Sequence, residues 1–169
     1  MNQPHRRKLQ ASSWFAVVRA YQECTRRYSQ LLKGFDLTIP QFDVLSAIHQ
    51  LADQATPKAI ADELVVTRGN ITGVLHRLQE RGLIRTRHNE QDGRSIVCEL
   101  TPDGRELLKK ARGAAALFID AQLTPFDDAT LRETEDQMKR MRSHLQTIDP
   151  DAIFEQALRM RRETRKKAS

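Results

Sequence analysis

Apolar residues recur at helical spacing near the middle of the chain. Four of them fall at positions i, i+3, i+4 and i+7, which places them in one stripe along a helix: Ile71, Val74, Leu75 and Leu78. Thr67 is the expected cap of this helix, and Gly82 its expected end. The opposite side is small and polar, with Gly69, Gly73 and His76 at its centre. Such an outer face can approach an anionic partner closely, and DNA is the partner that the pattern favours.

Threonines near prolines mark the predicted starts of the other helices. Thr38, Thr56, Thr101 and Thr124 each stand one or two residues before a proline, an order typical of a helix N-terminus. A long amphipathic helix is expected before them, over about residues 12–33, because apolar and aromatic residues recur there every three to four positions. The short helix after Thr56 and the central helix are separated by a tight turn, so together they predict a helix-turn-helix.

Alternating residues replace the helical pattern after the central helix. Two short strands are expected, with inward positions at Ile84 and Thr86 in the first and at Ile96, Cys98 and Leu100 in the second. A polar run over residues 89–94 separates them and ends in Asp-Gly-Arg, which is typical of a turn. The sequence thus predicts a β-hairpin, or wing, directly after the helix-turn-helix.

The predicted fold is mainly α with a small β-hairpin wing: a winged helix-turn-helix flanked by long N- and C-terminal dimerisation helices. The terminal helices have apolar stripes but little core of their own, so we expect them to pack against a second copy in a two-fold dimer. The expected divisions are a disordered basic arm over 1–10, dimerisation helices over 11–36 and 102–160, a winged helix-turn-helix over 37–101, and an unstructured basic tail over 161–169.

Charge and composition agree with a nucleic-acid binder without proving one. The 169 residues carry a formal net charge of +6, and residues 67–94 hold six arginines against three acidic residues. The two cysteines are too few for a disulfide framework, and no secretory signal or membrane-spanning run is expected. We therefore expect a soluble cytoplasmic protein that makes no membrane contact.

Several motifs in register resemble one family. Residues 37–45 (LTIPQFDVL), residues 67–72 (TRGNIT), Gly82-Leu83-Ile84, the Asp92-x-Arg94 wing and residues 100–104 (LTPDG) are similar to the MarR (multiple antibiotic resistance regulator) family of winged-helix transcription factors. The resemblance implies a homodimer that binds double-stranded DNA at a pseudo-palindromic operator, usually as a repressor. It also implies release by a small, often aromatic or phenolic, effector. One departure is Gly93, where the family commonly has arginine, so one wing contact to phosphate is expected to be missing.

Five residues of the central helix are expected to face the major groove: Arg68, Asn70, Thr72, His76 and Arg77. Arginine can recognise guanine and asparagine can recognise adenine, whereas Thr72 and Arg77 are equally suited to phosphate. The alternative is an ordinary solvated helix face.

The hairpin supplies a second set of candidate contacts. The resemblance implies that Arg94 enters the minor groove, and we expect Asp92 to hold it by an ion pair. The alternative for Arg94 and Asp92 is a surface ion pair that contributes little to stability. Arg85 and Arg87 on the hairpin are expected phosphate contacts, with a solvated strand edge as the alternative.

Other candidate chemistry is sparse. Trp14, Phe15 and Tyr21 are candidates to line a pocket for a flat ligand, although aromatic residues at helical spacing are more often interface core. Cys24 lies on an apolar stripe, and Cys98 shares a face with apolar strand residues, so both are expected to pack rather than to sense oxidants. No catalytic motif, metal site or cofactor is predicted.

Two other functions compete with a sequence-specific regulator. The basic termini also suit an architectural protein that binds DNA without regard to sequence, and a winged helix can serve as a protein-interaction module.

Overall fold

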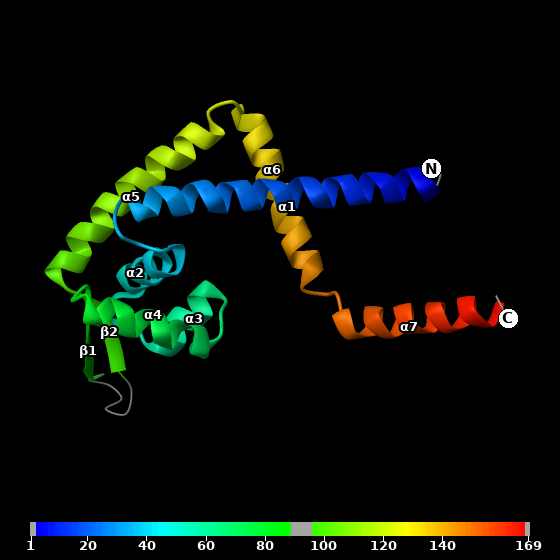
Figure 1. Cartoon of the computed structure of the whole chain (residues 1–169). Helices are drawn as coiled ribbons and strands as arrows, with labels where there is room; N and C mark the ends of the chain where they lie inside the picture. The colour runs from blue at the N-terminus through cyan, green and yellow to red at the C-terminus, as the bar shows by residue number, and fades with distance from the viewer. Residues whose placement is uncertain (1–2, 89–95, 168–169) are drawn as a thin grey trace. The chain divides into compact units, whose positions relative to one another are not determined.

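The computed structural model describes residues 3–88 and 96–167, with side chains described through residue 161. The chain divides into two compact units, residues 1–122 and 123–169. The helices of the first unit are α1 (Gln3–Lys33), α2 (Ile39–Leu51), the 3-10 helix η1 (Ala52–Gln54), α3 (Pro57–Leu64), α4 (Arg68–Glu80) and α5 (Pro102–Leu123) (Figure 1). Its strands are β1 (Ile84–His88) and β2 (Ile96–Leu100), and the second unit consists of α6 (Asp128–Leu145) and α7 (Pro150–Lys167). The predicted mainly α fold with a small hairpin is confirmed.

The first helix is longer than the sequence pattern predicted. α1 begins at Gln3, so the expectation of a disordered arm over residues 1–10 is wrong for residues 3–10. Pro4 does not prevent this, because a proline in the first turn removes no hydrogen bond that the helix would otherwise form. Between Pro4 and Lys33 the sequence contains neither proline nor glycine, so nothing in it stops the helix. The first half of α1 is exposed, and Leu32 near its end is buried.

In the first unit the helix starts follow the predicted caps, and only Thr67 lacks the expected capping contact. Thr38 and Gln41 form a reciprocal capping box at the start of α2, with the Thr38 backbone N–H donating to Gln41 Oε1 at 2.9 Å. The hydroxyl of Thr56 accepts from the backbone N–H of Ala59 at 3.1 Å at the start of α3. Thr67 occupies the cap position of α4, but its side chain makes no capping hydrogen bond. The predicted position of the Thr67 cap is therefore right, and the predicted contact is wrong.

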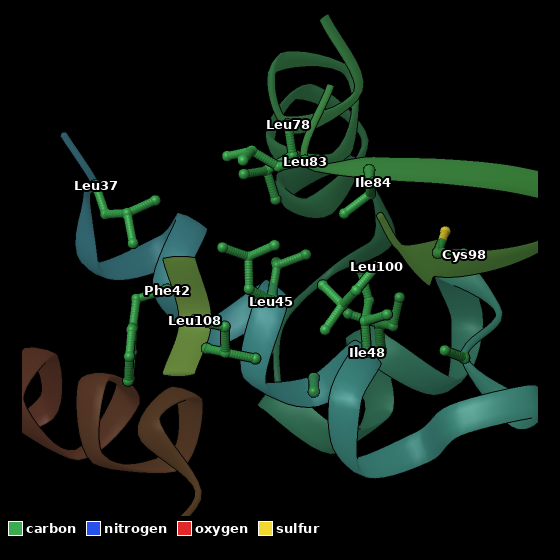
Figure 2. Close-up of a cluster of buried hydrophobic side chains, with 14 of the residues drawn as sticks. Leu37, Phe42, Leu45, Ile48, Leu78, Leu83, Ile84, Cys98, Leu100 and Leu108 are labelled. Carbon is green, nitrogen blue, oxygen red and sulfur yellow. The ribbon is translucent and has the colours of Figure 1, made fainter. Parts of the chain in front are cut away.

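One apolar core holds the helix-turn-helix, the hairpin and the start of α5 together. Figure 2 shows side chains from α2, α4, β1, β2 and α5 converging on Leu45 and Ile48, which are almost fully buried. Leu78 of α4 and Leu108 of α5 belong to the same cluster. Because burial of one such side chain stabilises a protein by roughly 1.5–3 kcal/mol, this shared core fixes the position of α4 relative to the hairpin.

The two strands form an antiparallel hairpin in which Ile84 pairs with Leu100 and Thr86 with Cys98. The predicted alternation fails in both strands: Thr86 of β1 is exposed, and in β2 Ile96 is exposed while Val97 and Cys98 are both fully buried. The second edge of β2 explains part of this difference, because the backbone N–H of Cys98 donates to the carbonyl oxygen of Ala55 at 2.9 Å. β2 therefore lies between β1 and the segment before α3.

The start of α5 packs closely on the loop between α4 and β1. The Thr101 hydroxyl donates to the carbonyl oxygen of Gly82 at 2.7 Å and accepts from the backbone N–H of Gly104 at 3.0 Å. A Cβ atom on Gly104 would overlap the carbonyl group of Leu83. A side chain at this position would force α5 away from the hairpin, which gives the glycine a packing role.

The second unit differs from the prediction at the start of α6 and at the end of α7. α6 begins at Asp128 rather than after Thr124, because the Asp127 carboxylate accepts from the backbone N–H of Thr130 at 2.9 Å and caps the helix there. α7 runs to Lys167, so the expected unstructured tail over 161–169 is wrong for residues 161–167. No described helix is long and apolar enough to cross a lipid bilayer.

Candidate nucleic-acid interface

The helix-turn-helix is built by α3 and α4 with a three-residue connection. Val65 adopts a left-handed backbone conformation, with φ of 54°, which reverses the chain direction after α3. The backbone N–H of Val66 then donates to the carbonyl oxygen of Ala61 at 3.0 Å and closes the turn. This local geometry sets α4 across the end of α3, as the predicted motif requires.

The two faces of α4 are divided as the sequence pattern predicted. Ile71 and Leu78 are buried, and Val74 and Leu75 are half-buried against the core. All five predicted contact residues are exposed on the helix: Arg68, Asn70, Thr72, His76 and Arg77. The apolar stripe is therefore confirmed, while the partner of the exposed face stays a prediction.

The five exposed side chains differ in whether they already make hydrogen bonds or ion pairs within the protein. The Thr72 hydroxyl donates to the carbonyl oxygen of Arg68 at 3.0 Å, and Arg77 Nε donates to the carbonyl oxygen of Gly73 at 3.0 Å. His76 Nδ1 lies 3.3 Å from a carboxylate oxygen of Glu80. Within the described part of the chain, the other two side chains, those of Arg68 and Asn70, make no hydrogen bond. They are the side chains most available to an external partner.

The glycines of α4 have no internal packing role. A Cβ atom on Gly69 would meet nothing within 4 Å, and one on Gly73 would meet only the flexible end of Arg77 at 3.5 Å. Alanine would stabilise an ordinary helix interior by about 1 kcal/mol relative to glycine. The small outer face is thus unexplained by the fold and suits the close approach of another molecule.

Basic residues of the hairpin are engaged in an ion-pair cluster that the sequence analysis missed. Glu99 accepts from Nε of both Arg85 and Arg87, and the Arg85 contact measures 2.9 Å. Arg87 also lies 2.8 Å from the carboxylate of Asp53 in η1. These guanidinium groups lower the pKa of Glu99, chiefly through the hydrogen bond from Arg87. The two arginines are therefore partly neutralised within the protein rather than standing free for phosphate.

One ion pair of this cluster, between Arg85 and Glu99, could have been predicted from the sequence. Arg85 and Glu99 are directly opposite in the register, and opposite charges at such positions attract. The contribution of Asp53 depends on the tertiary position of η1 and has no local sequence signal. Asp92, Gly93 and Arg94 lie outside the described residues, so the predicted tip of the wing stays a sequence-based prediction.

The predicted ligand-pocket aromatics do not line a described hollow. Trp14, Phe15 and Tyr21 are 59%, 50% and 70% exposed, and the first two contact each other edge to face with ring centroids 4.9 Å apart. The assignment of these three residues to a ligand pocket therefore stays a prediction. Their exposure on α1 fits the alternative that the sequence left open, an apolar face that packs in an interface.

A different hollow, of about 580 Å³, opens among α1, α2 and α5. Its aromatic wall is formed by Tyr28 and Phe42, whose rings meet edge to face at 5.9 Å. The buried hydroxyl of Ser46 lines the hollow and has no hydrogen-bond partner among the described residues. Burial raises the pKa of the Tyr28 hydroxyl, which therefore can serve as a hydrogen-bond donor at neutral pH as any tyrosine does. Arg112 of α5 adds a cation, so this site offers apolar walls with a few polar groups.

The fold and the exposed face of α4 define a winged helix-turn-helix protein. The model of the MarR family matches residues 35–95 of this chain. An uncharacterised helix-turn-helix transcriptional regulator of Bacillus cereus is 33% identical over 125 residues, covering 74% of this chain and 80% of the relative. The chain belongs to the MarR family and is a transcriptional regulator rather than an enzyme.

Solved structures that share this fold include CouR and MepR. CouR from Rhodococcus jostii, crystallised with p-coumaroyl-CoA, superposes with a TM-score of 0.70 at 19% identity, over 79% of this chain and 93% of CouR. MepR from Staphylococcus aureus, in complex with DNA, superposes with a TM-score of 0.70 at 22% identity, over 79% of this chain and 96% of MepR.

Proposed function

We propose that the protein is a dimeric, sequence-specific DNA-binding repressor that a small aromatic molecule releases from a pseudo-palindromic operator. The observation that carries the proposal is the outer face of α4, where Arg68 and Asn70 are exposed without a partner in the described chain beside glycines that packing does not require. The MepR–DNA complex supports the use of this fold on DNA.

Base recognition is assigned to the two free side chains. Arg68 can donate two hydrogen bonds to the O6 and N7 atoms of guanine, and Asn70 can pair with the N6 and N7 atoms of adenine. Thr72 and Arg77 already contact the backbone of α4, so their remaining capacity suits phosphate oxygens. His76 extends the same face toward the middle of the groove.

Dimerisation follows from apolar surface that one chain leaves uncovered. Leu9, Trp14 and Phe15 on α1 are each at least half exposed. On the second unit, exposed apolar residues recur along α6 and the turn after it: Met138, Met141, Leu145 and Ile148. Patches of this kind commonly mark protein interfaces. Two copies would carry two α4 helices to successive major grooves, roughly 34–36 Å apart.

The hollow beside Tyr28 and Phe42 is the proposed effector site. A flat ring can pack against these aromatic side chains, and a polar group on it can pair with the Ser46 hydroxyl. The site contacts α2, which packs against α3 and α4, so a ligand can shift the helix-turn-helix. The structure of CouR with p-coumaroyl-CoA supports an aromatic ligand in this fold.

Selection from a random DNA library with the full chain tests the DNA-binding part. We expect enrichment of an inverted repeat whose half-sites are about one helical turn apart. Enrichment without a common sequence would instead indicate an architectural protein. The effector part is tested by titrating p-coumarate into the complex with the selected DNA. Release by the wild type and weakened release by Ser46→Ala would support the assigned hollow, while equal release would place the ligand elsewhere.

A further inference from the structure

A second hollow lies among α2, α3 and the start of α4. It has a volume of about 390 Å³, within the range of small-molecule sites. Val44 of α2, Leu64 of α3, and Ile71 and Val74 of α4 form its apolar walls. None of these residues lines the hollow beside Tyr28, so the two are separate.

The rim of this second hollow is also apolar. Val66, in the turn between α3 and α4, lines it and is 43% exposed. The neighbouring Val65 is 77% exposed and is held there by its left-handed backbone conformation. Exposed valines next to a hollow lose contact with water when a ligand covers them, which favours an apolar occupant.

Asp43 gives the hollow its chemical character. Of the described residues that line the hollow, Asp43 alone is charged, and no described cationic side chain lies within 4 Å of its carboxylate. Burial raises the pKa of this carboxyl group, which is the effect of removing water without supplying a cation. Asn70 adds one amide at the edge, and the remaining lining is uncharged.

We propose that this hollow binds a small apolar organic cation, such as an aryl or alkyl ammonium, with Asp43 as its counter-ion. An anion would be repelled by Asp43, and a neutral apolar molecule would bury the carboxylate further without a partner. A divalent metal ion takes about six oxygen ligands, and one carboxylate with one amide is too few. A hydrophobic cation is the class of ligand that can both pack against the apolar walls and pair with the Asp43 carboxylate.

Occupancy of this site would be linked to α4. Asn70, Ile71 and Val74 all belong to that helix, and Asn70 is also on the face assigned to DNA. A cation held between Asp43 and α4 therefore touches the element that reads DNA. The binding site itself does not depend on the proposed function, since its walls and charge are those of the free chain.

The test uses the full chain and benzyltrimethylammonium as the probe, with benzyl alcohol as its neutral counterpart. Binding is followed by methyl chemical shifts, which report on Val44, Leu64, Ile71 and Val74. We expect saturable binding of the cation with shifts at these residues, and at least tenfold weaker binding of the alcohol. Shifts confined to other residues, or equal affinity for the two probes, would overturn the proposal.

Variants separate the role of Asp43 from that of net charge. Asp43→Asn should weaken binding of the cation about tenfold or more, because it removes the counter-ion but keeps the shape. Asp62→Asn is the matched control, since Asp62 is an exposed acid of α3 that does not line the hollow. Asp43→Glu should retain most of the affinity. Equal losses for Asp43→Asn and Asp62→Asn would contradict the assignment, and the comparison of probes on the wild type decides the case if a variant fails to fold.

Discussion

The guanidinium group of Arg87 lies 2.8 Å from the carboxylate of Asp53, which joins the first strand of the hairpin to the turn after α2. Glu99 on the second strand binds the same arginine and Arg85 as well. This cluster fixes the base of the wing and leaves it close to electrically neutral. It therefore limits how much the hairpin can contribute to binding a polyanion.

Replacing Glu99 by glutamine should strengthen non-specific DNA binding. The change removes one negative charge and frees Arg85, while Arg87 keeps its ion pair with Asp53, so the slope of log affinity against log salt should steepen by up to about one. Fluorescence anisotropy with random-sequence duplex across salt concentrations measures this slope. Glu23→Gln on α1 is the matched control, because Glu23 also binds two arginines, Arg26 and Arg27. An equal change in both variants would show that only net charge matters.

The same glutamate predicts a pH dependence of stability. Its folded-state pKa is lowered, so its stabilising contribution is fully present above the unfolded-state pKa and is lost as pH falls through the folded-state pKa. The free energy of unfolding of the wild type should therefore fall more steeply below about pH 4.5 than that of Glu99→Gln. Urea unfolding at a series of pH values measures both curves. Parallel curves would mean that the ion pairs are not maintained in solution.

Gly104 and Gly113 should respond in opposite directions to substitution by alanine. Gly104→Ala places a methyl group against the carbonyl of Leu83 and should destabilise the fold by about 2 kcal/mol or more. Gly113→Ala, in the same helix, meets nothing within 4 Å and should stabilise it by roughly 0.5–1 kcal/mol. Thermal unfolding of the two variants measures whether each substitution lowers or raises the stability of the fold. Stabilisation by Gly104→Ala would contradict the described packing of α5 on the hairpin.

Helix starts and the stripe of α4 could be predicted from sequence because their causes are local. Thr38 and Thr56 cap helices through hydrogen bonds to residues three positions away, and the apolar spacing in α4 needs no knowledge of distant segments. The charged N-terminal segment suggests disorder, so the sequence does not reveal the early start of α1. Charge alone does not stop a helix, however, and nothing else in that segment stops one.

The candidate ligand site was harder to predict from sequence than the helix starts, because its residues come together only in the tertiary structure. Tyr28 of α1 and Ile119 of α5 are far apart in sequence and line one hollow only because α1, α2 and α5 come together. The aromatic residues that sequence favoured, Trp14 and Phe15, lie on the part of α1 that extends beyond those contacts. The residues of α4 could be identified because one helix presents them all.

Gly73→Ala should separate the stability of the fold from binding to DNA. Alanine meets no backbone at this position and should stabilise α4 by about 1 kcal/mol. The added methyl group lies on the face assigned to DNA, so operator affinity should fall about tenfold. Thermal unfolding and anisotropy on the same preparation measure the two effects, and Gly113→Ala provides a control that gains stability without losing affinity. Unchanged affinity in Gly73→Ala would remove α4 from the interface.

The two cysteines should differ sharply in reactivity. Cys98 is fully buried, and burial raises the pKa of its thiol to about 11, so little nucleophilic thiolate is present at neutral pH. Cys24 is half-buried, with its Sγ atom 3.4 Å from Gln122 Oε1. Intact mass after treatment with N-ethylmaleimide should show modification of Cys24 in the native protein and of Cys98 only after unfolding. Labelling of native Cys24→Ser at the wild-type rate would contradict this.

Affinity for the selected operator and for a scrambled duplex, measured over a range of salt concentrations, tests the central claim most directly. A sequence-specific regulator should prefer its operator by at least ~10³ at physiological salt, and Asn70→Ala should reduce that preference by about 1–3 kcal/mol at one base step. Equal affinities for the two duplexes, changing together with salt, would contradict the account and leave only an electrostatic DNA binder.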